Sequence, residues 1–127
     1  MTKKAVLTAK DFLEKKKLID KLPKNYYSEY FGGEIEIDSN VPKSEIMVIV
    51  SDDDDDQYRK YLKLIYMCCP IFKSAVFRDE IGDIKEPYEV IDKVFTGAIT
   101  ELFALGNFIM RKYGFLPVED TSKIKKQ

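Results

Sequence analysis

The chain has 127 residues, of which 45% are hydrophobic and 34% charged, with 21 Lys and Arg against 22 Asp and Glu. This length suits one domain with a modest core, and the composition excludes a disordered tail. No apolar run approaches the roughly 20 residues that a membrane-spanning helix needs, so we expect no membrane segment. The apolar stretch after Lys3 and Lys4 is too short for a secretory signal, and we expect a cytoplasmic protein.

Several residue types on which enzymes and metal sites depend are missing. The chain has no histidine, which removes the commonest general base and metal ligand. Its two cysteines, Cys68 and Cys69, are adjacent, and two sulfurs without histidine cannot close a structural zinc site. We interpret both as buried apolar residues rather than redox or nucleophilic groups. The sequence therefore predicts no catalytic residue, no metal site and no cofactor.

The charges are divided unevenly along the chain. Residues 1–25 carry eight Lys against three acids, residues 26–56 ten acids against one Lys, and residues 57–127 twelve bases against nine acids. We interpret 1–25 as a basic helix or arm, 26–114 as a single helical domain and 115–127 as a flexible polar tail. The basic arm lacks arginines and interleaved aromatics, which favours a solvated helix over nucleic-acid binding.

The first predicted elements are a helix and a β-hairpin. Thr8 with Asp11 three residues later predicts a helix that begins there, runs to about Lys21 and stops before Pro23. A hairpin is expected near residues 28–38, with Gly32-Gly33 as a two-residue turn and an alternating strand at 34–38. That register pairs Tyr30 with Ile35 and also brings two glutamates, Glu29 and Glu36, face to face.

Two acidic or ambiguous segments follow. Residues 46–50 are apolar and β-branched, which favours a strand, whereas Pro42 followed by Ser44 and Glu45 favours a short helix, to which we give preference. The run Asp52–Asp56 favours a helix start capped by Ser51 over a cation site, because cation loops alternate their ligands and include a glycine. This helix should end at Pro70 and bury Tyr58, Tyr61, Leu62, Ile65, Cys68 and Cys69.

Three further helices are predicted in the last third of the chain. A short helix within 71–86 stops at Gly82 and turns Val76, Phe77 and Ile81 inward; Glu86-Pro87 then opens another that reaches Phe95. The last runs from about Ala98 to Tyr113 and is ended by Gly114. The predicted fold class is mainly α (α+β): a small helical bundle of about five helices with a short N-terminal β-hairpin.

Two segments resemble a known family. Residues 61–70, YLKLIYMCCP, and 85–95, KEPYEVIDKVF, are similar in order and spacing to the XkdN-like tail assembly chaperones of phages and phage-tail-like particles of Gram-positive bacteria. The resemblance covers roughly residues 30–112 and departs from the family pattern at Cys68 and at residues 96–98. It consists of core positions and includes no catalytic motif.

The resemblance implies a non-enzymatic role. Such chaperones coat the tape measure protein, keep it soluble and help recruit tail tube protein subunits in the host bacterial cytoplasm, and they are absent from the mature particle. It implies these two partners, with self-association as a further expectation, and no nucleic acid. A minor structural or tail-completion protein of the tail is the alternative. The candidates for protein binding form an apolar stripe on the last helix: Ile99, Leu102, Phe103, Ile109 and Met110. The alternative is that this stripe simply belongs to the core of the domain.

Overall fold

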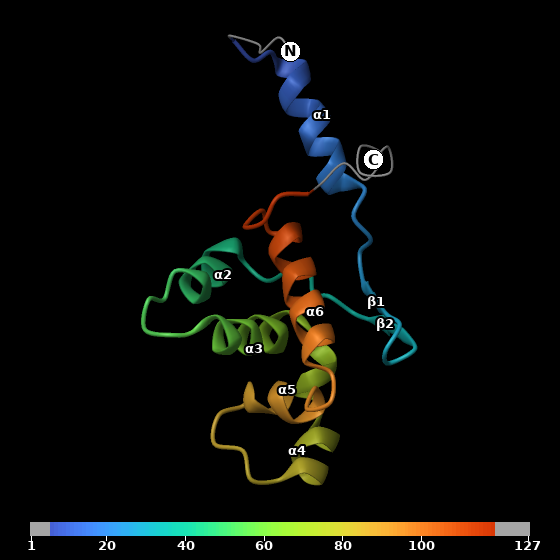
Figure 1. Cartoon of the computed structure of the whole chain (residues 1–127), viewed down its shortest axis with the longest axis vertical. Coiled ribbons are helices and arrows are strands. Elements are labelled where there is room, and N and C mark those ends of the chain that lie inside the picture. Colours follow the sequence, from blue (N-terminus) through green and yellow to red (C-terminus); the bar gives the residue numbers. More distant parts are fainter. Residues whose placement is uncertain (1–5, 119–127) are drawn as a thin grey trace.

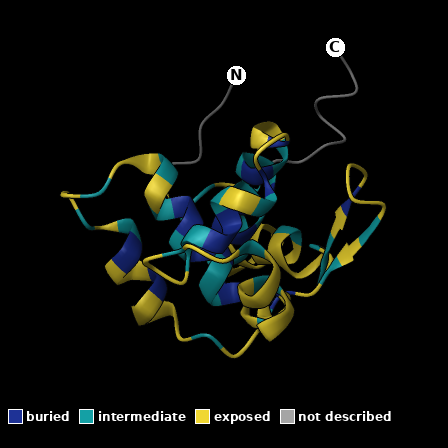
Figure 2. Ribbon diagram, turned by 90° about the horizontal axis from the view of Figure 1, so that it is seen from below, coloured by how far each residue is buried: buried dark blue, intermediate teal, exposed yellow. Residues whose placement is uncertain are grey.

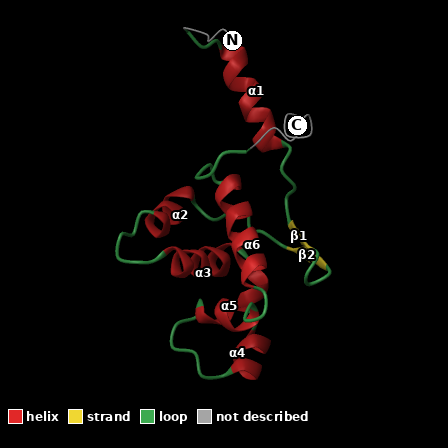
Figure 3. Ribbon diagram, viewed as in Figure 1, coloured by secondary structure: helices red, strands yellow, loops and turns green. Residues whose placement is uncertain are grey.

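The chain is mainly helical in the computed structural model, which describes residues 6–118 (Figure 1 and Figure 3). The expected fold class, a helical bundle with a short hairpin near the N-terminus, is confirmed. In chain order the elements are α1 (Ala9–Asp20), β1 (Tyr26–Ser28), β2 (Gly33–Ile35), α2 (Lys43–Val50), α3 (Gln57–Cys68), the 3-10 helix η1 (Pro70–Lys73), α4 (Ala75–Ile81), α5 (Glu89–Val94) and α6 (Ile99–Lys112).

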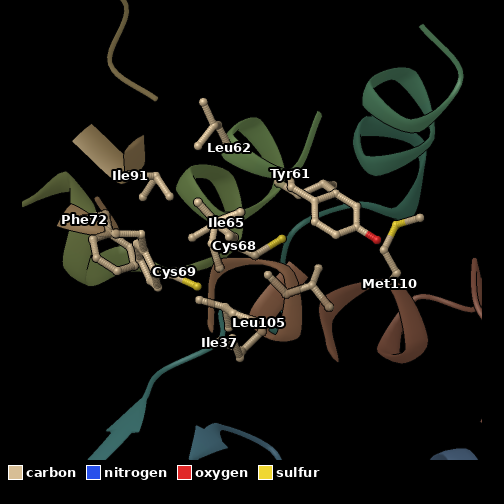
Figure 4. Close-up of a cluster of buried hydrophobic side chains, with 14 of the residues drawn as sticks. Ile37, Tyr61, Leu62, Ile65, Cys68, Cys69, Phe72, Ile91, Leu105 and Met110 are labelled. Carbon is tan, nitrogen blue, oxygen red and sulfur yellow. The ribbon is translucent and has the colours of Figure 1, made fainter. Parts of the chain in front are cut away.

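The core forms where α6 crosses α3, with α2, α5 and η1 packed around the crossing (Figure 1). Buried residues gather at the centre of the molecule and exposed ones at its edge (Figure 2). Figure 4 shows how Ile65, Cys68, Cys69 and Leu105 meet inside this cluster. The side chains with no measurable exposure include Ile46, Leu64, Ile65, Cys68, Cys69, Ile91, Phe95, Leu102, Leu105 and Ile109.

Helix α1 begins where the sequence predicts. The Thr8 side chain accepts a hydrogen bond from the Asp11 backbone N–H, and the Asp11 carboxylate accepts one from the Thr8 N–H at 2.8 Å. This reciprocal capping box satisfies backbone donors that a helix start leaves unpaired. The helix contributes no buried residue, and it projects away from the rest of the fold (Figure 1).

The segment between α1 and β1 is tied to the C-terminal end of α6. The Lys112 ammonium donates to the carbonyl oxygens of Pro23 and Lys24, at 2.8 and 3.1 Å. Burial, together with the nearby charge of Lys24, lowers the pKa of Lys112. The Asn25 side chain then accepts from the Ile37 N–H and donates to Glu34, so the connection enters the hairpin in a defined direction.

The hairpin exists, but its predicted register was wrong. Tyr26 pairs with Ile35 and Ser28 with Gly33, which leaves a four-residue connection in place of the two-residue turn, and the predicted strand at 34–38 ends at Ile35. This register avoids the repulsive Glu29–Glu36 pair and lets Tyr26 pack edge-on against Phe108, with ring centroids 5.4 Å apart. Gly32 takes the positive φ of 78° that closes the connection.

Residues 43–50 form a helix, as preferred, and not a strand. Ile46 and Ile49, three residues apart, are its two buried side chains, while Met47 and Val48 are exposed. Helical spacing lets this apolar run place two isoleucines on the core. Because the helix ends at Val50, Ser51 is its C-terminal cap, with the Ser51 hydroxyl donating to the Met47 carbonyl oxygen at 2.8 Å.

The prediction that Ser51 and the aspartate run begin the next helix was therefore wrong. Residues 52–55 form a turn, and Asp56 alone caps α3 by accepting from the Arg59 N–H at 2.8 Å. Asp55 pairs with Lys63 and Arg59 across the first turns of α3, and its hydrogen bond with Lys63 raises the pKa of that lysine. The run reverses the chain between two helices that both pack on the core, and this tertiary demand overrides the local helix-start signal.

The C-terminal half follows the predicted order with smaller differences. Gly82 ends α4 at a φ of 63°, as predicted, but Val76 is 65% exposed and does not face inward. Helix α5 begins two residues beyond Pro87. Gly114 takes the left-handed conformation after α6. The predicted polar tail starts differently: Phe115 and Leu116 pack against the core, whereas residues 119–127, like 1–5, lie outside the described part.

Candidate protein-binding groove

An apolar groove opens between the hairpin and the η1–α4–α5 end of the bundle. It has a volume of about 500 Å³. We call it the hairpin groove; its eight lining residues are Phe31, Glu34, Ile35, Glu36, Ile71, Phe72, Phe77 and Val94. Four separate elements supply them, so only the assembled fold creates this surface.

Three phenylalanines, Phe31, Phe72 and Phe77, line the hairpin groove, and the buried Phe95 connects the first two of them. Phe31 meets Phe95 edge-on, at a centroid distance of 5.2 Å, and Phe95 packs on Phe72 at 5.9 Å. Phe72 continues to Phe77 at 5.7 Å. Phe95 is fully buried and Phe72 nearly so, so the core fixes the positions of these two rings. A rigid aromatic surface loses little conformational entropy when a partner covers it.

The rim of the hairpin groove combines exposed apolar side chains with negative charge. Phe31 is 46% exposed and Ile71 is 52% exposed. The only charged residues that line the groove are Glu34 and Glu36. This combination suits an amphipathic helix whose apolar stripe is flanked by lysine or arginine.

The five residues proposed from the sequence do not form one surface. Leu102 and Ile109 are fully buried and Met110 is nearly so; these three belong to the core. Phe103 is half-buried, with its ring centroid 5.4 Å from that of Tyr61. Ile99 alone is exposed, at 48%, and it lines a separate, more polar hollow beside Tyr30 and Glu101. The stripe on α6 is thus mainly the inner face of the bundle, which was the alternative interpretation.

The residues that line the hairpin groove were not among the sequence candidates. Ile71 lies directly after Pro70, which the sequence identifies only as a helix end, and Phe31 lies in a turn. A large apolar residue in a segment predicted to be a turn is a usable signal, because such a residue has no local core to bury it. That signal alone does not indicate which distant residues complete the surface.

Neither a metal-binding cluster nor an exposed thiol is found among the described residues. Within residues 6–118 no group of three or more Cys, Asp or Glu side chains is arranged to hold a metal ion. Cys68 and Cys69 are both buried and unpaired by disulfide. Burial, with the charge of Asp38, raises the pKa of the Cys68 thiol to about 12, and burial places that of Cys69 higher still. Both thiols are held protonated and act as apolar filler.

None of the helices in the described part of the chain has the length and apolar character to cross a membrane. The hairpin groove is an apolar hollow of about 500 Å³ on the surface of the described residues. Comparisons with family models, with curated proteins and with solved structures give no match to this chain.

Proposed function

We propose that this chain is a tail assembly chaperone of the XkdN-like kind, which binds a tape measure protein, keeps it soluble and helps recruit tail tube subunits. The observation that carries the proposal is the hairpin groove, an apolar surface with an aromatic floor and exposed Phe31 and Ile71 at its rim. A long helical client presents repeated apolar stripes, and a groove of this kind covers one such stripe.

The two segments that resemble the family support the proposal through their place in the fold. Residues 61–70 end at Pro70, immediately before Ile71 and Phe72, and residues 85–95 include Val94 and end at Phe95. Most of their apolar side chains are buried in the α3–α5 part of the core. A sequence pattern that specifies this packing therefore helps to position Ile71, Phe72 and Val94, three of the residues that line the hairpin groove.

The proposed role sets the partner chemistry and the location. The client segment is an amphipathic helix whose apolar face enters the groove and whose basic residues lie near Glu34 and Glu36. Binding through a small number of aromatic contacts allows the client to be released when tube subunits replace the chaperone. The chain acts in the host bacterial cytoplasm and leaves before the particle is complete.

Co-expression with a tape measure protein tests the proposal. The soluble fraction of the tape measure protein should rise when this chain is present. It should fall again with Ile71→Glu, which adds a charge at an exposed position of the groove. Val48→Glu is the matched control, because Val48 is 70% exposed on α2 and does not line the groove. Unchanged solubility with and without the chain would count against a chaperone role.

A minor structural or tail-completion protein is the alternative. Mass spectrometry of purified particles separates the two functions, since a structural protein is present in fixed stoichiometry and a chaperone is absent. Stoichiometric recovery of this chain from particles would replace the proposed function with the alternative.

A further inference from the structure

Helix α1 carries apolar side chains that the described residues leave uncovered. Phe12 is 64%, Leu13 57% and Ile19 43% exposed, and no residue of the helix is buried. A helix of 12 residues is marginally stable in water without a packing surface. Despite its capping box, α1 would therefore be stabilised by a surface that covers these side chains.

The hairpin groove has the chemistry to receive this helix. Phe12, Lys15 and Ile19 recur at three- and four-residue spacing and so share one face of α1. Residues 6–24 contain six lysines against three acids, whereas both charged residues that line the groove are glutamates. The apolar side chains of α1 thus suit the apolar floor of the groove, and its lysines are complementary in charge to the glutamates at the rim.

The α1 helix of the same chain is held away from its own groove. The two hydrogen bonds from Lys112 tie residues 23–24 to the C-terminal end of α6. The hairpin groove is formed by η1, α4, α5 and the hairpin, toward the opposite end of the molecule from α1 (Figure 1). A second copy has no such restriction, because its α1 projects freely from its own body.

We propose that α1 of one copy docks in the hairpin groove of a second copy, with Phe12 and Ile19 on the aromatic floor and Lys15 beside Glu34 and Glu36. The second copy thereby supplies the side chains that complete the groove. This self-association goes beyond the proposed function, because it requires only this chain. Since α1 and a client helix would occupy the same groove, self-association is measured on the purified chain without any tape measure protein, so its failure is distinguishable from a failure of the proposed function.

The purified full chain tests the inference by light-scattering mass measured across a hundredfold range of concentration. Self-association should raise the mass above 14.8 kDa as concentration increases. Phe12→Glu on α1 and Ile71→Glu in the groove should each raise the dissociation constant of self-association at least about tenfold. Val48→Glu on α2 should leave it unchanged. All three substituted positions are exposed in the wild type, and circular dichroism verifies that each variant is folded.

Mixing identifies which surfaces meet. Each of the two variants has lost one half of the contact. A mixture of Phe12→Glu and Ile71→Glu should therefore associate more strongly than either alone, because Ile71→Glu supplies an intact α1 and Phe12→Glu an intact groove. Glu36→Lys and Lys15→Glu should each weaken association, and the double variant should recover part of it.

Three results would overturn the inference. A mass of one chain at every concentration excludes a second copy and leaves α1 folded against its own body or solvated. Equal losses in Val48→Glu and Ile71→Glu place the contact elsewhere. If the mixture of Phe12→Glu and Ile71→Glu associates no more strongly than either variant alone, α1 of one copy does not bind the groove of another.

Discussion

The ring of Tyr61 on α3 lies directly against Gly106 on α6. A β-carbon built at Gly106 would be 2.4 Å from Cδ2 and 2.8 Å from Cε2 of that ring, closer than real side chains approach. The Tyr61 hydroxyl also donates to the Asn107 side chain, which holds the ring in this position. The two central helices therefore approach closely because one of them lacks a side chain at the crossing.

Gly106→Ala should destabilise the protein, although alanine favours helices more than glycine does. The intrinsic preference is worth about 1 kcal/mol in favour of alanine. Forcing Tyr61 out of its site and separating α3 from α6 costs about 1–3 kcal/mol, and the hydrogen bond to Asn107 is strained as well. We expect a net loss of about 1–2 kcal/mol in the free energy of unfolding, measured by urea denaturation.

Gly97→Ala is the control for this effect. Its β-carbon would have the Tyr30 hydroxyl oxygen as its nearest neighbour, at 3.6 Å, an ordinary contact distance. We expect a change of less than about 0.5 kcal/mol. Equal effects at the two glycines would mean that backbone freedom, and not the close approach of Tyr61, determines the result.

Features that depend on neighbouring residues were predictable from the sequence. Thr8 and Asp11 are three residues apart, and their capping box forms as the local pattern indicates. Gly82 and Gly114 end their helices with positive φ for the same local reason. These signals involve a few adjacent residues and are not overridden by packing.

Features that depend on distant residues were not predictable in this way. The hairpin register follows from the contact between Tyr26 and Phe108, which are 82 positions apart. The aspartate run forms a turn because the helices on both sides of it reach the core. The hairpin groove joins Phe31 to Val94 through the tertiary fold alone. The periodic spacing of apolar residues within one segment does not specify such contacts between distant segments.

The second prediction concerns the pH dependence of stability. Burial, then the hydrogen bond to Asp92 and the charge of that carboxylate, raises the pKa of Tyr58 to about 12. Because the folded protein favours the neutral phenol, this contribution is complete below about pH 10, the unfolded value, and is lost as pH rises from there toward 12. The free energy of unfolding of the wild type should fall between pH 8 and 11 by up to about 1 kcal/mol more than that of Tyr58→Phe.

The comparison with Tyr58→Phe isolates Tyr58, because Tyr26 and Tyr113, whose pKa values are also raised to about 12, are present in both proteins. Their losses cancel in the comparison. Parallel pH profiles for wild type and variant would show that the bond between Tyr58 and Asp92 contributes nothing to folding.

The third prediction concerns the two thiols. Because burial raises the pKa values of both cysteines, the native protein at pH 8 contains almost no thiolate. An aromatic disulfide reagent should react with the folded chain on the order of a thousandfold more slowly than with the chain in urea, where both thiols become reactive. Fast reaction of one thiol in the folded protein would instead indicate an accessible cysteine and a redox role.

The last prediction concerns the bond that sets the direction of α1. The Lys112 ammonium donates to the carbonyl oxygen of Lys24, the residue after which trypsin cleaves, and to that of Pro23. Lys112→Ala removes both hydrogen bonds, so the segment should open more often and cleavage after Lys24 should become several-fold faster. Lys112→Arg keeps a donor and should remain close to the wild type.

Cleavage within α1, after Lys16 or Lys17, should change little, because the bonds of Lys112 are made at residues 23–24, beyond the end of that helix. Mass spectrometry of the early fragments separates these sites, and equal acceleration at all of them would show that the substitution loosens the whole chain rather than releasing the arm.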